Sequence, residues 1–155
     1  MATLRLTNYL DNEGVKYKSI KHPESFTAME TSQISHLDPK NVAKTVIVRT
    51  PKRLLMIVLS ANHHLDLDLL SKEINEPHLD LAKESEFATE FPDCETGAMP
   101  PFGNLYGMEV YVTDDLTKDK KITFNAGTHR ELLEIDFKDF QALTHPKIIH
   151  VTNAH

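Results

Sequence analysis

The sequence predicts an α+β fold in which a mixed β-sheet closes on itself and helices pack outside it. Two apolar, β-branched runs at residues 44–49 and 54–59 are joined by only four residues, which is typical of a β-hairpin. Helical and extended patterns alternate without a strict βαβ order, which disfavours a doubly wound sheet. With 155 residues, of which 40% are hydrophobic, residues 1–155 are expected to form one domain with a core of its own.

The first third of the chain is expected to hold two short helices and one strand. Residues 4–13 predict a helix that ends at Gly14, which can adopt the left-handed conformation common after helices. Residues 15–20 alternate in a way that favours a strand. Thr27 and Glu30 have capping-box spacing, so a helix should start there and run toward His36.

The later elements are predicted from the same signals. The strands at residues 44–49 and 54–59 are apolar at nearly every position, so both of their faces should be covered. Residues 66–74 predict a helix, Ser85 is expected to cap a short helix that runs toward Phe91, and Asp136 should start another before Phe140. Further strands are expected at residues 108–113, 122–125, 132–135 and 148–151.

Charge is distributed unevenly along the chain. Residues 16–53 carry eight Lys or Arg and three Asp or Glu, whereas residues 54–116 carry two and thirteen, and the whole chain has a net charge of −6. This division favours one face that attracts phosphate, although ordinary solvated faces would give the same pattern. The overall negative charge argues against binding to DNA and favours a small phosphorylated ligand or the end of a nucleic acid.

Several classes of protein are disfavoured by composition. The single Cys94 excludes an intramolecular disulfide and any multi-cysteine metal site. The adjacent His63 and His64 lack the spacing of a helical zinc site, so no metal is expected. The longest apolar run, residues 54–59, is too short to cross a bilayer, and no apolar signal segment opens the chain. We therefore expect a cytoplasmic protein with no membrane partner and no dinucleotide or other cofactor.

Lys44 is the first candidate for a catalytic or ligand-binding residue. It stands at the start of a strongly apolar strand. Its ammonium group either reaches solvent or enters a pocket, where it would act as a point charge toward a phosphate or a carbonyl oxygen.

Two later segments are the other candidates. In residues 96–104, two glycines bracket Pro100 and Pro101, which suits either a loop with an approachable backbone or a structural turn. In residues 124–131, a glycine-containing turn could present Asn125, Thr128, His129 and Arg130 to a pocket, or it could be a surface hairpin.

In order and spacing, these segments resemble the YbaK/EbsC family of aminoacyl-tRNA deacylases, which is related to the editing domain of bacterial prolyl-tRNA synthetase. The likeness spans residues 15–146. The residues that carry it are Val42-Ala43-Lys44-Thr45, then Gly97, Pro101, Phe102 and Gly103, then Asn125-Ala126-Gly127, with His22-Pro23 and Phe26-Thr27-Ala28 upstream.

The resemblance implies a barrel-like mixed sheet and hydrolysis of the ester that joins a wrong amino acid to the terminal adenosine of a tRNA. The implied partner is the acceptor end of a mischarged tRNA, an aminoacyl-tRNA synthetase is a second candidate partner, and no metal or cofactor is implied. Lys44 would contact the terminal nucleotide or the substrate carbonyl. The expected catalytic residues are Lys44, Gly97 and Asn125, and the expected substrate-binding residues are His22, Thr27, Thr45, Met99, Pro100, Pro101, Gly127, Thr128 and His129.

The chemistry of an aminoacyl ester suits this hypothesis. Because the ester is already activated, a positioned water and stabilisation of the oxyanion can suffice, and the vicinal hydroxyl of the tRNA could help to activate the water. Met99 and Pro100 depart from the usual loop pattern of the family, so the amino-acid specificity cannot be transferred. Two alternatives stay open: a non-catalytic module that binds a nucleotide, an aminoacyl ligand or a synthetase, and a metal hydrolase that uses several of the nine histidines.

Overall fold

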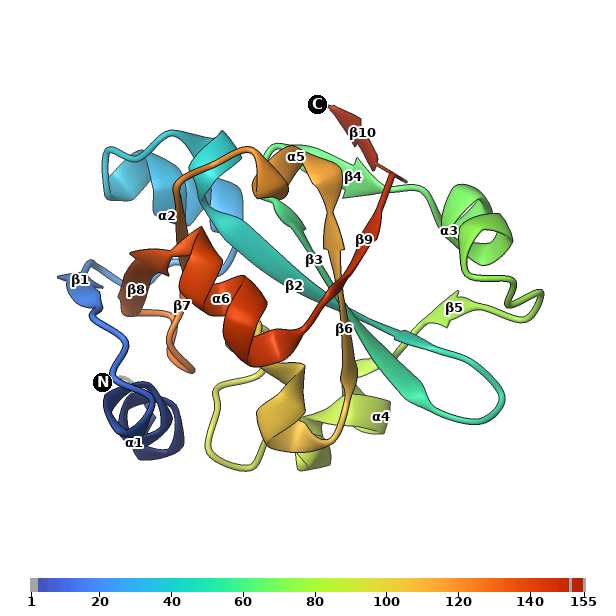
Figure 1. Ribbon diagram of the computed structural model, residues 1–155, viewed down its shortest axis with the longest axis horizontal. Helices are drawn as coiled ribbons and strands as arrows, with labels where there is room; N and C mark the ends of the chain where they lie inside the picture. The colour runs from blue at the N-terminus through green and yellow to red at the C-terminus, as the bar shows by residue number, and fades with distance from the viewer. Residues whose placement is uncertain (1–2, 151, 155) are drawn as a thin grey trace.

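The computed structural model describes residues 3–150 and 152–154, in which three β-sheets are covered by short helices (Figure 1). The α-helices are α1 (Leu4–Asn12), α2 (Ala28–Ile34), α3 (Leu67–Glu73), α4 (Glu84–Phe87), α5 (Asp114–Thr117) and α6 (Phe137–Thr144). Three short 3₁₀ helices accompany them, namely η1 (Pro39–Asn41), η2 (Ala88–Glu90) and η3 (Gly103–Tyr106). Helices and strands are thus mixed along the chain, as the sequence predicts.

The largest sheet has five strands in the order β5 (Asp80–Leu81), β2 (Ala43–Arg49), β3 (Leu54–Ser60), β6 (Glu109–Thr113) and β9 (Lys147–Ile149). The strands β2 and β3 form the predicted antiparallel hairpin, whereas β3, β6 and β9 are parallel. A three-stranded sheet has the order β1 (Lys18–Lys21), β8 (Glu131–Asp136) and β7 (Lys121–Asn125), and β4 (His63–Leu65) pairs with β10 (Thr152–Ala154).

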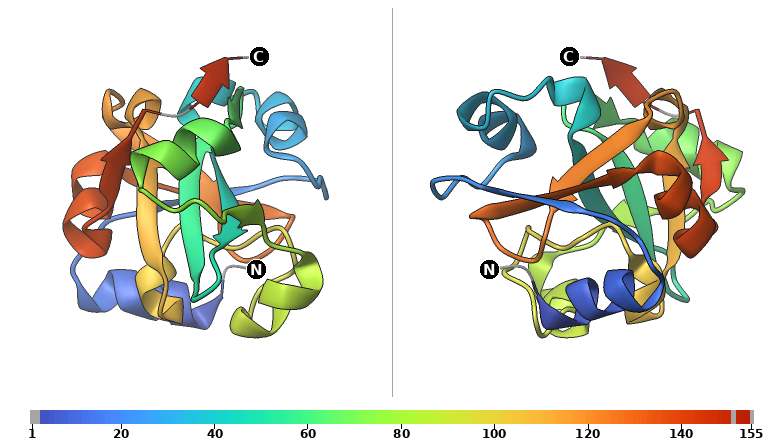
Figure 2. Two further views of the ribbon diagram at one scale, coloured as in Figure 1. Left: turned by 90° about the vertical axis from the view of Figure 1, so that its right-hand side faces the viewer. Right: turned by 60° about the vertical axis from the view of Figure 1, so that its left-hand side comes forward.

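The prediction of a sheet that closes into a barrel is wrong. The two larger sheets are joined at one corner by a single parallel bridge between Val42 and Thr123. The outer strands β5 and β9, only two and three residues long, are the edges of the five-stranded sheet. Because one bridge cannot continue a hydrogen-bonded ladder from β2 into β7, the sheets cross one another and do not close (Figure 2).

The strand β3 lies between two apolar clusters, and every residue from Leu55 to Ser60 is buried. Met56 and Val58 point into the larger cluster, which the aromatic side chains of Phe102, Phe124 and Phe140 share. Leu55, Ile57 and Leu59 point the other way, toward Leu70 of α3 and Tyr111 of β6. This alternation confirms for β3 the prediction that both faces are covered.

Most of the local signals read from the sequence are confirmed. The Thr27 hydroxyl accepts a hydrogen bond from the Glu30 N–H at 3.1 Å and caps α2, and the Asp66 carboxylate caps α3 through the Leu69 N–H at 3.1 Å. Gly14 has a φ of +70°, as expected after α1. The helix predicted to run toward His36 ends at Ile34.

Three local predictions are displaced. The strand expected at residues 15–20 is β1, which begins at Lys18. Lys83 and not Ser85 precedes α4, because the Glu86 carboxylate accepts a hydrogen bond from the Lys83 backbone N–H at 2.8 Å. The strand expected at residues 148–151 is β9, which ends at Ile149, and Val151 lies outside the described residues. Within the described ranges, no helix combines the length and apolar character that a membrane span requires.

Candidate functional site

A cavity of about 480 Å³ opens where the start of β2, the start of α2 and the end of β7 come together. Five of the residues expected at the site line it: Thr27, Lys44, Thr45, Gly97 and Asn125. These residues come from four separate stretches of the chain, so the fold brings together what the sequence separates. We call this space the Lys44 cavity.

Lys44 enters the cavity from the second position of β2, where it pairs with Leu59 of β3. The side chain is half-buried, and this burial lowers the pKa of its ammonium group because the charged form loses solvation. Among the described residues, the structure shows no carboxylate paired with it. A desolvated ammonium group without a counter-charge is suited to meet negative charge on a ligand.

Asn125 is the last residue of β7 and lies on the same cavity. Its side-chain carbonyl oxygen is buried and accepts no hydrogen bond from any described residue. A buried polar atom without a partner is costly, and such atoms in folded proteins are usually satisfied by water or a ligand. The cavity therefore offers one cation and one unused acceptor.

Gly97 forms part of the wall in a backbone conformation that requires glycine. Its φ is +88°, and a Cβ at this position would stand 3.5 Å from Cε1 of His129. The loop around Gly97 is fastened to the turn after β7: the Gly127 N–H donates to the Ala98 carbonyl at 2.9 Å, and the Glu95 N–H donates to the Gly127 carbonyl at 2.8 Å. These bonds hold the Gly97 backbone at the cavity edge.

His129 lies behind this wall and ties three loops together. Its backbone N–H donates to the Glu95 carboxylate at 2.6 Å, and its backbone carbonyl accepts from Ser25 N–H at 3.1 Å. The ring Nε2 is 2.9 Å from the Thr96 carbonyl, so Nε2 carries the hydrogen because a carbonyl can only accept. The His129 N–H, followed by the Thr128 hydroxyl, holds the pKa of Glu95 below its usual value, which keeps this carboxylate charged.

Phe26 forms an aromatic rim on the cavity. Its side chain is 64% exposed, and its ring centroid lies 4.9 Å from that of His129. A large apolar side chain held in the open by a buried partner offers a flat surface to a ring or an apolar group of a ligand.

Comparison with known proteins identifies the family. A family model described as the aminoacyl-tRNA editing domain matches residues 22–143, a range that contains every residue considered so far for the cavity. The chain belongs to this family. No curated protein matches the sequence.

Solved structures share the fold of this editing domain. A protein described as a proposed trans-editing enzyme for prolyl tRNA synthetase is 23% identical, with a TM-score of 0.83 over 97% of this chain and 96% of that one. A hypothetical protein is 16% identical, with a TM-score of 0.85 over 96% and 99% of the two chains. A scaffold protein used for computational epitope grafting is 21% identical, with a TM-score of 0.84 over 97% and 96%. At these identities the likeness concerns the fold.

The other expected site residues of the editing domain do not line the cavity. Met99, Pro100 and Pro101 are buried in the loop after Gly97, and the thioether sulfur of Met99 accepts a hydrogen bond from the Gly97 N–H at 3.2 Å. Gly127, Thr128 and His129 are buried behind the wall. His22 lies at the base of the Phe26 loop, where its backbone N–H donates to the Arg130 carbonyl at 3.0 Å.

Five cavity residues were not among the site residues expected from the sequence: Phe26, Ala28, Met29, Ala61 and His64. One signal could have found two of them. In the predicted hairpin, Ala43 pairs with Ser60, so the residues that follow Ser60 must emerge beside Lys44. The described residues offer no ligand set for the metal-hydrolase alternative, since no three His, Cys, Asp or Glu side chains among them are placed to hold an ion.

Proposed function

We propose that this editing domain is a trans-acting hydrolase that cleaves the ester bond of a mischarged tRNA. The observation that carries the proposal is the pairing, in one cavity, of a half-buried ammonium group at Lys44 with an unused buried acceptor at Asn125. The family of the domain and the described role of its trans-editing structural neighbour support the assignment. The substrate is the aminoacylated acceptor end of a tRNA in the cytoplasm, with a synthetase as a candidate partner.

In the proposed reaction, a water molecule adds to the ester carbonyl and negative charge develops on the carbonyl oxygen. The Lys44 ammonium stabilises this oxyanion, in a cavity where partial burial strengthens the interaction. The Asn125 side-chain oxygen accepts a hydrogen bond from the attacking water and orients it. The bond to the ribose oxygen then breaks, and that oxygen takes up the proton lost by the water, with the vicinal ribose hydroxyl as the relay.

No cysteine nucleophile is part of this proposal. Cys94 is half-buried, and burial raises the pKa of its thiol to about 11, so the thiol stays protonated near neutral pH. Its sulfur lies 3.4 Å from the Tyr106 hydroxyl and is not among the atoms that line the Lys44 cavity. The nucleophile in the proposed mechanism is therefore water.

The deciding experiment is a deacylation assay on a panel of mischarged tRNAs that includes Ala, Ser, Cys and Pro on tRNA(Pro). The wild type is compared with Lys44→Ala and with Lys52→Ala, which removes an exposed lysine at the far end of the same hairpin. We expect turnover of at least one ester, a loss of about 100-fold or more in Lys44→Ala, and no change in Lys52→Ala. A folded wild type that binds aminoacyl ligands but hydrolyses none would contradict the proposal and favour a binding module.

A further inference from the structure

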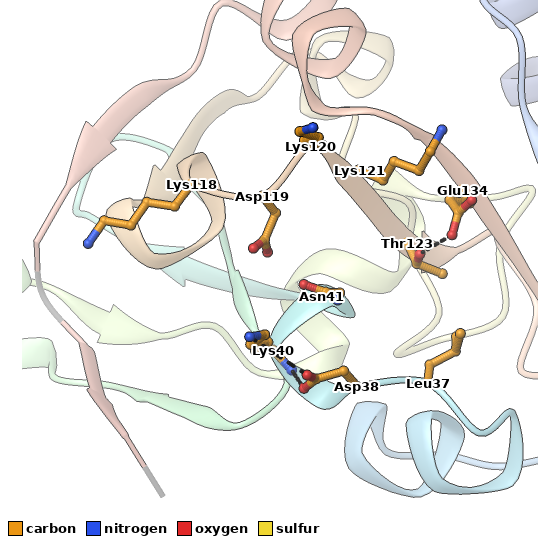
Figure 3. Close-up of a pocket in the computed structure, with 10 residues that line it drawn as sticks. All are labelled: Leu37, Asp38, Lys40, Asn41, Lys118, Asp119, Lys120, Lys121, Thr123 and Glu134. Carbon is orange, nitrogen blue, oxygen red and sulfur yellow. Dashed lines mark hydrogen bonds and ion pairs between the residues drawn. The ribbon is translucent and has the colours of Figure 1, made fainter.

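A second cavity, of about 510 Å³, lies beyond the end of α2 and has a rim of lysines (Figure 3). Lys40 comes from η1, Lys118 and Lys120 come from the turn between α5 and β7, and Lys121 is the first residue of β7. Figure 3 shows Asp119 pointing inward toward Asn41, whereas the Lys118 and Lys121 side chains extend outward. The ammonium groups of Lys118 and Lys121 therefore extend away from one another and do not converge on one central point.

Two smaller hollows continue this surface. One shares Lys120 with the second cavity and adds Lys138, and the other shares Lys121 and adds Lys16 and Lys18. We call these seven lysines the lysine surface. Only four carboxylates line the same hollows, in a chain whose net charge is −6, so positive charge is concentrated here. The lysine surface brings lysines of the basic stretch at residues 16–53 together with lysines that lie near the C-terminus in sequence.

Two lysines of this surface form ion pairs within the described part of the chain, and the other five do not. Lys40 is 3.8 Å from the Asp38 carboxylate and Lys121 is 3.0 Å from that of Asp136. Lys118 and Lys120 are exposed, and no carboxylate of the described residues forms an ion pair with either. Removing the side chains of Lys118 and Lys120 would therefore leave the internal ion pairs intact.

The lysine surface and the Lys44 cavity are neighbours along the same strand. Lys121 and Thr123 line the second cavity, and Asn125 lines the Lys44 cavity. Successive side chains of a strand point to opposite faces, so these three residues, two positions apart, project from one face of β7. At about 3.4 Å per residue, Lys121 and Asn125 are roughly 14 Å apart and Thr123 and Asn125 about 7 Å. On the other side, Val42, which precedes Lys44 by two positions, is bridged to Thr123.

We propose that the lysine surface binds the phosphate backbone of the substrate RNA next to the nucleotide whose ester occupies the Lys44 cavity. This inference rests on the proposed function. Lysines spread outward over three adjoining hollows match an extended polyanion better than a single small phosphate, which needs converging donors. Contacts of this kind set the position and orientation of a nucleic acid without reading its sequence. Base identity would then be read elsewhere, or not at all.

The test measures binding of an uncharged tRNA(Pro) transcript and of its acceptor-stem microhelix by fluorescence anisotropy across a salt series. The variant is the double substitution Lys118→Ala and Lys120→Ala, and the matched control is Lys52→Ala with Lys72→Ala, two exposed lysines outside these hollows. We expect about tenfold weaker binding in the first pair only, with a shallower dependence of log K on log salt, by about one unit for each phosphate that the variant no longer neutralises. Equal affinities and slopes for wild type and variant would overturn the inference.

A second readout separates this inference from the proposed function. With a minimal ester, a 3′-aminoacyl adenosine that has no neighbouring phosphates, the lysine double variant should react as fast as wild type. With the full aminoacyl-tRNA it should show a raised KM and an unchanged kcat. Lysine-dependent RNA binding without any deacylation would overturn only the proposed function. Two results would overturn only the proposed role of the lysine surface. One is deacylation with the same KM for aminoacyl-tRNA in wild type and in the lysine double variant, and the other is binding of inorganic phosphate without binding of RNA.

Discussion

The Lys44 cavity and the contacts around Cys94 are two regions whose polar groups are partnered in opposite ways. Around Cys94 the polar side chains partner one another: the Cys94 sulfur is 3.4 Å from the Tyr106 hydroxyl, which donates to Asp93 at 3.0 Å. The Arg5 guanidinium lies 4.8 Å above the Tyr106 ring and 3.9 Å from Asp93. In the Lys44 cavity, the ammonium group and the Asn125 oxygen have no such partners among the described residues.

The difference distinguishes a structural contact from a binding site. The Cys94 region fastens α1 to the loop before η3, and its polar groups are already satisfied, so they gain nothing from a ligand. The Lys44 cavity keeps an ammonium group and an amide oxygen that no described residue satisfies, which costs stability and favours binding. Substitutions in the two regions should therefore divide cleanly into effects on activity and effects on stability.

The largest expected effect comes from Lys44→Met. Loss of the ammonium group should reduce kcat/KM on the edited aminoacyl-tRNA by about 10²–10³, the usual effect of losing one oxyanion donor. The free energy of unfolding should stay unchanged or rise, because a half-buried charge is replaced by an apolar side chain of similar length. Single-turnover deacylation and thermal unfolding test both halves, and a loss of stability with the rate preserved would reverse the contrast between the regions.

The next effect is expected from Asn125→Ala. If the Asn125 oxygen orients the attacking water, its removal should lower kcat by about tenfold, or roughly 1.4 kcal/mol in the barrier. Stability should change little, since this oxygen has no partner among the described residues. The comparison variant is Asn104→Ala, which removes an exposed amide that donates to the Tyr9 hydroxyl at 3.0 Å and lies outside the cavity. An equal loss of kcat in both variants would argue against the role of Asn125.

Tyr106→Phe should produce the complementary result. Removing the hydroxyl takes away the hydrogen bonds with Asp93 and Cys94, which should lower the free energy of unfolding by about 1 kcal/mol. The rate of deacylation should stay within twofold of wild type, because this residue lies outside the Lys44 cavity. Denaturant unfolding together with the deacylation assay measures both, and a large fall in kcat would make the Cys94 region part of the site.

The smallest effect, and the most specific, is on the pH dependence. Burial holds the pKa of Lys44 below 10.5, so the enzymatic rate, corrected for spontaneous ester hydrolysis, should fall as the pH rises through that lowered pKa. Lys44→Arg should keep whatever activity it retains on the alkaline side, because arginine stays protonated. The folded state binds fewer protons than the unfolded state between the lowered pKa and 10.5, so the Lys44 contribution to stability increases with pH there. A rate without an alkaline limb in the wild type would exclude a protonated Lys44 from the reaction.

Much of the local structure could be predicted because it depends on neighbours in the chain. The caps at Thr27 and Asp66 use side chains three residues from their partners, and the positive φ of Gly14 follows from the absence of a Cβ. The hairpin of β2 and β3 needs only four connecting residues. The α+β class and the position of Lys44 at the start of a strand also follow from such local patterns in the sequence.

The remaining features depend on distant parts of the chain. Whether the sheet closes depends on β2 and β7, which touch at one bridge between residues about eighty positions apart in sequence. Met99 and Pro100 face inward because the loop is fastened to Gly127 and Glu95, and no local pattern shows that direction. The lysine surface likewise joins residues from both ends of the chain.

The sequence by itself therefore determined the helices, the hairpin and the segments that resemble an editing domain. Only the tertiary structure decided which of those segments share one cavity, and that Phe26 and His64 share it with them. The physical reason is the range of the interactions: caps, turns and strand periodicity act over a few residues and leave a local pattern. Both the burial of Lys44 and the burial of an Asn125 oxygen that no described residue hydrogen-bonds result from packing between distant elements, which appears only when the chain has folded.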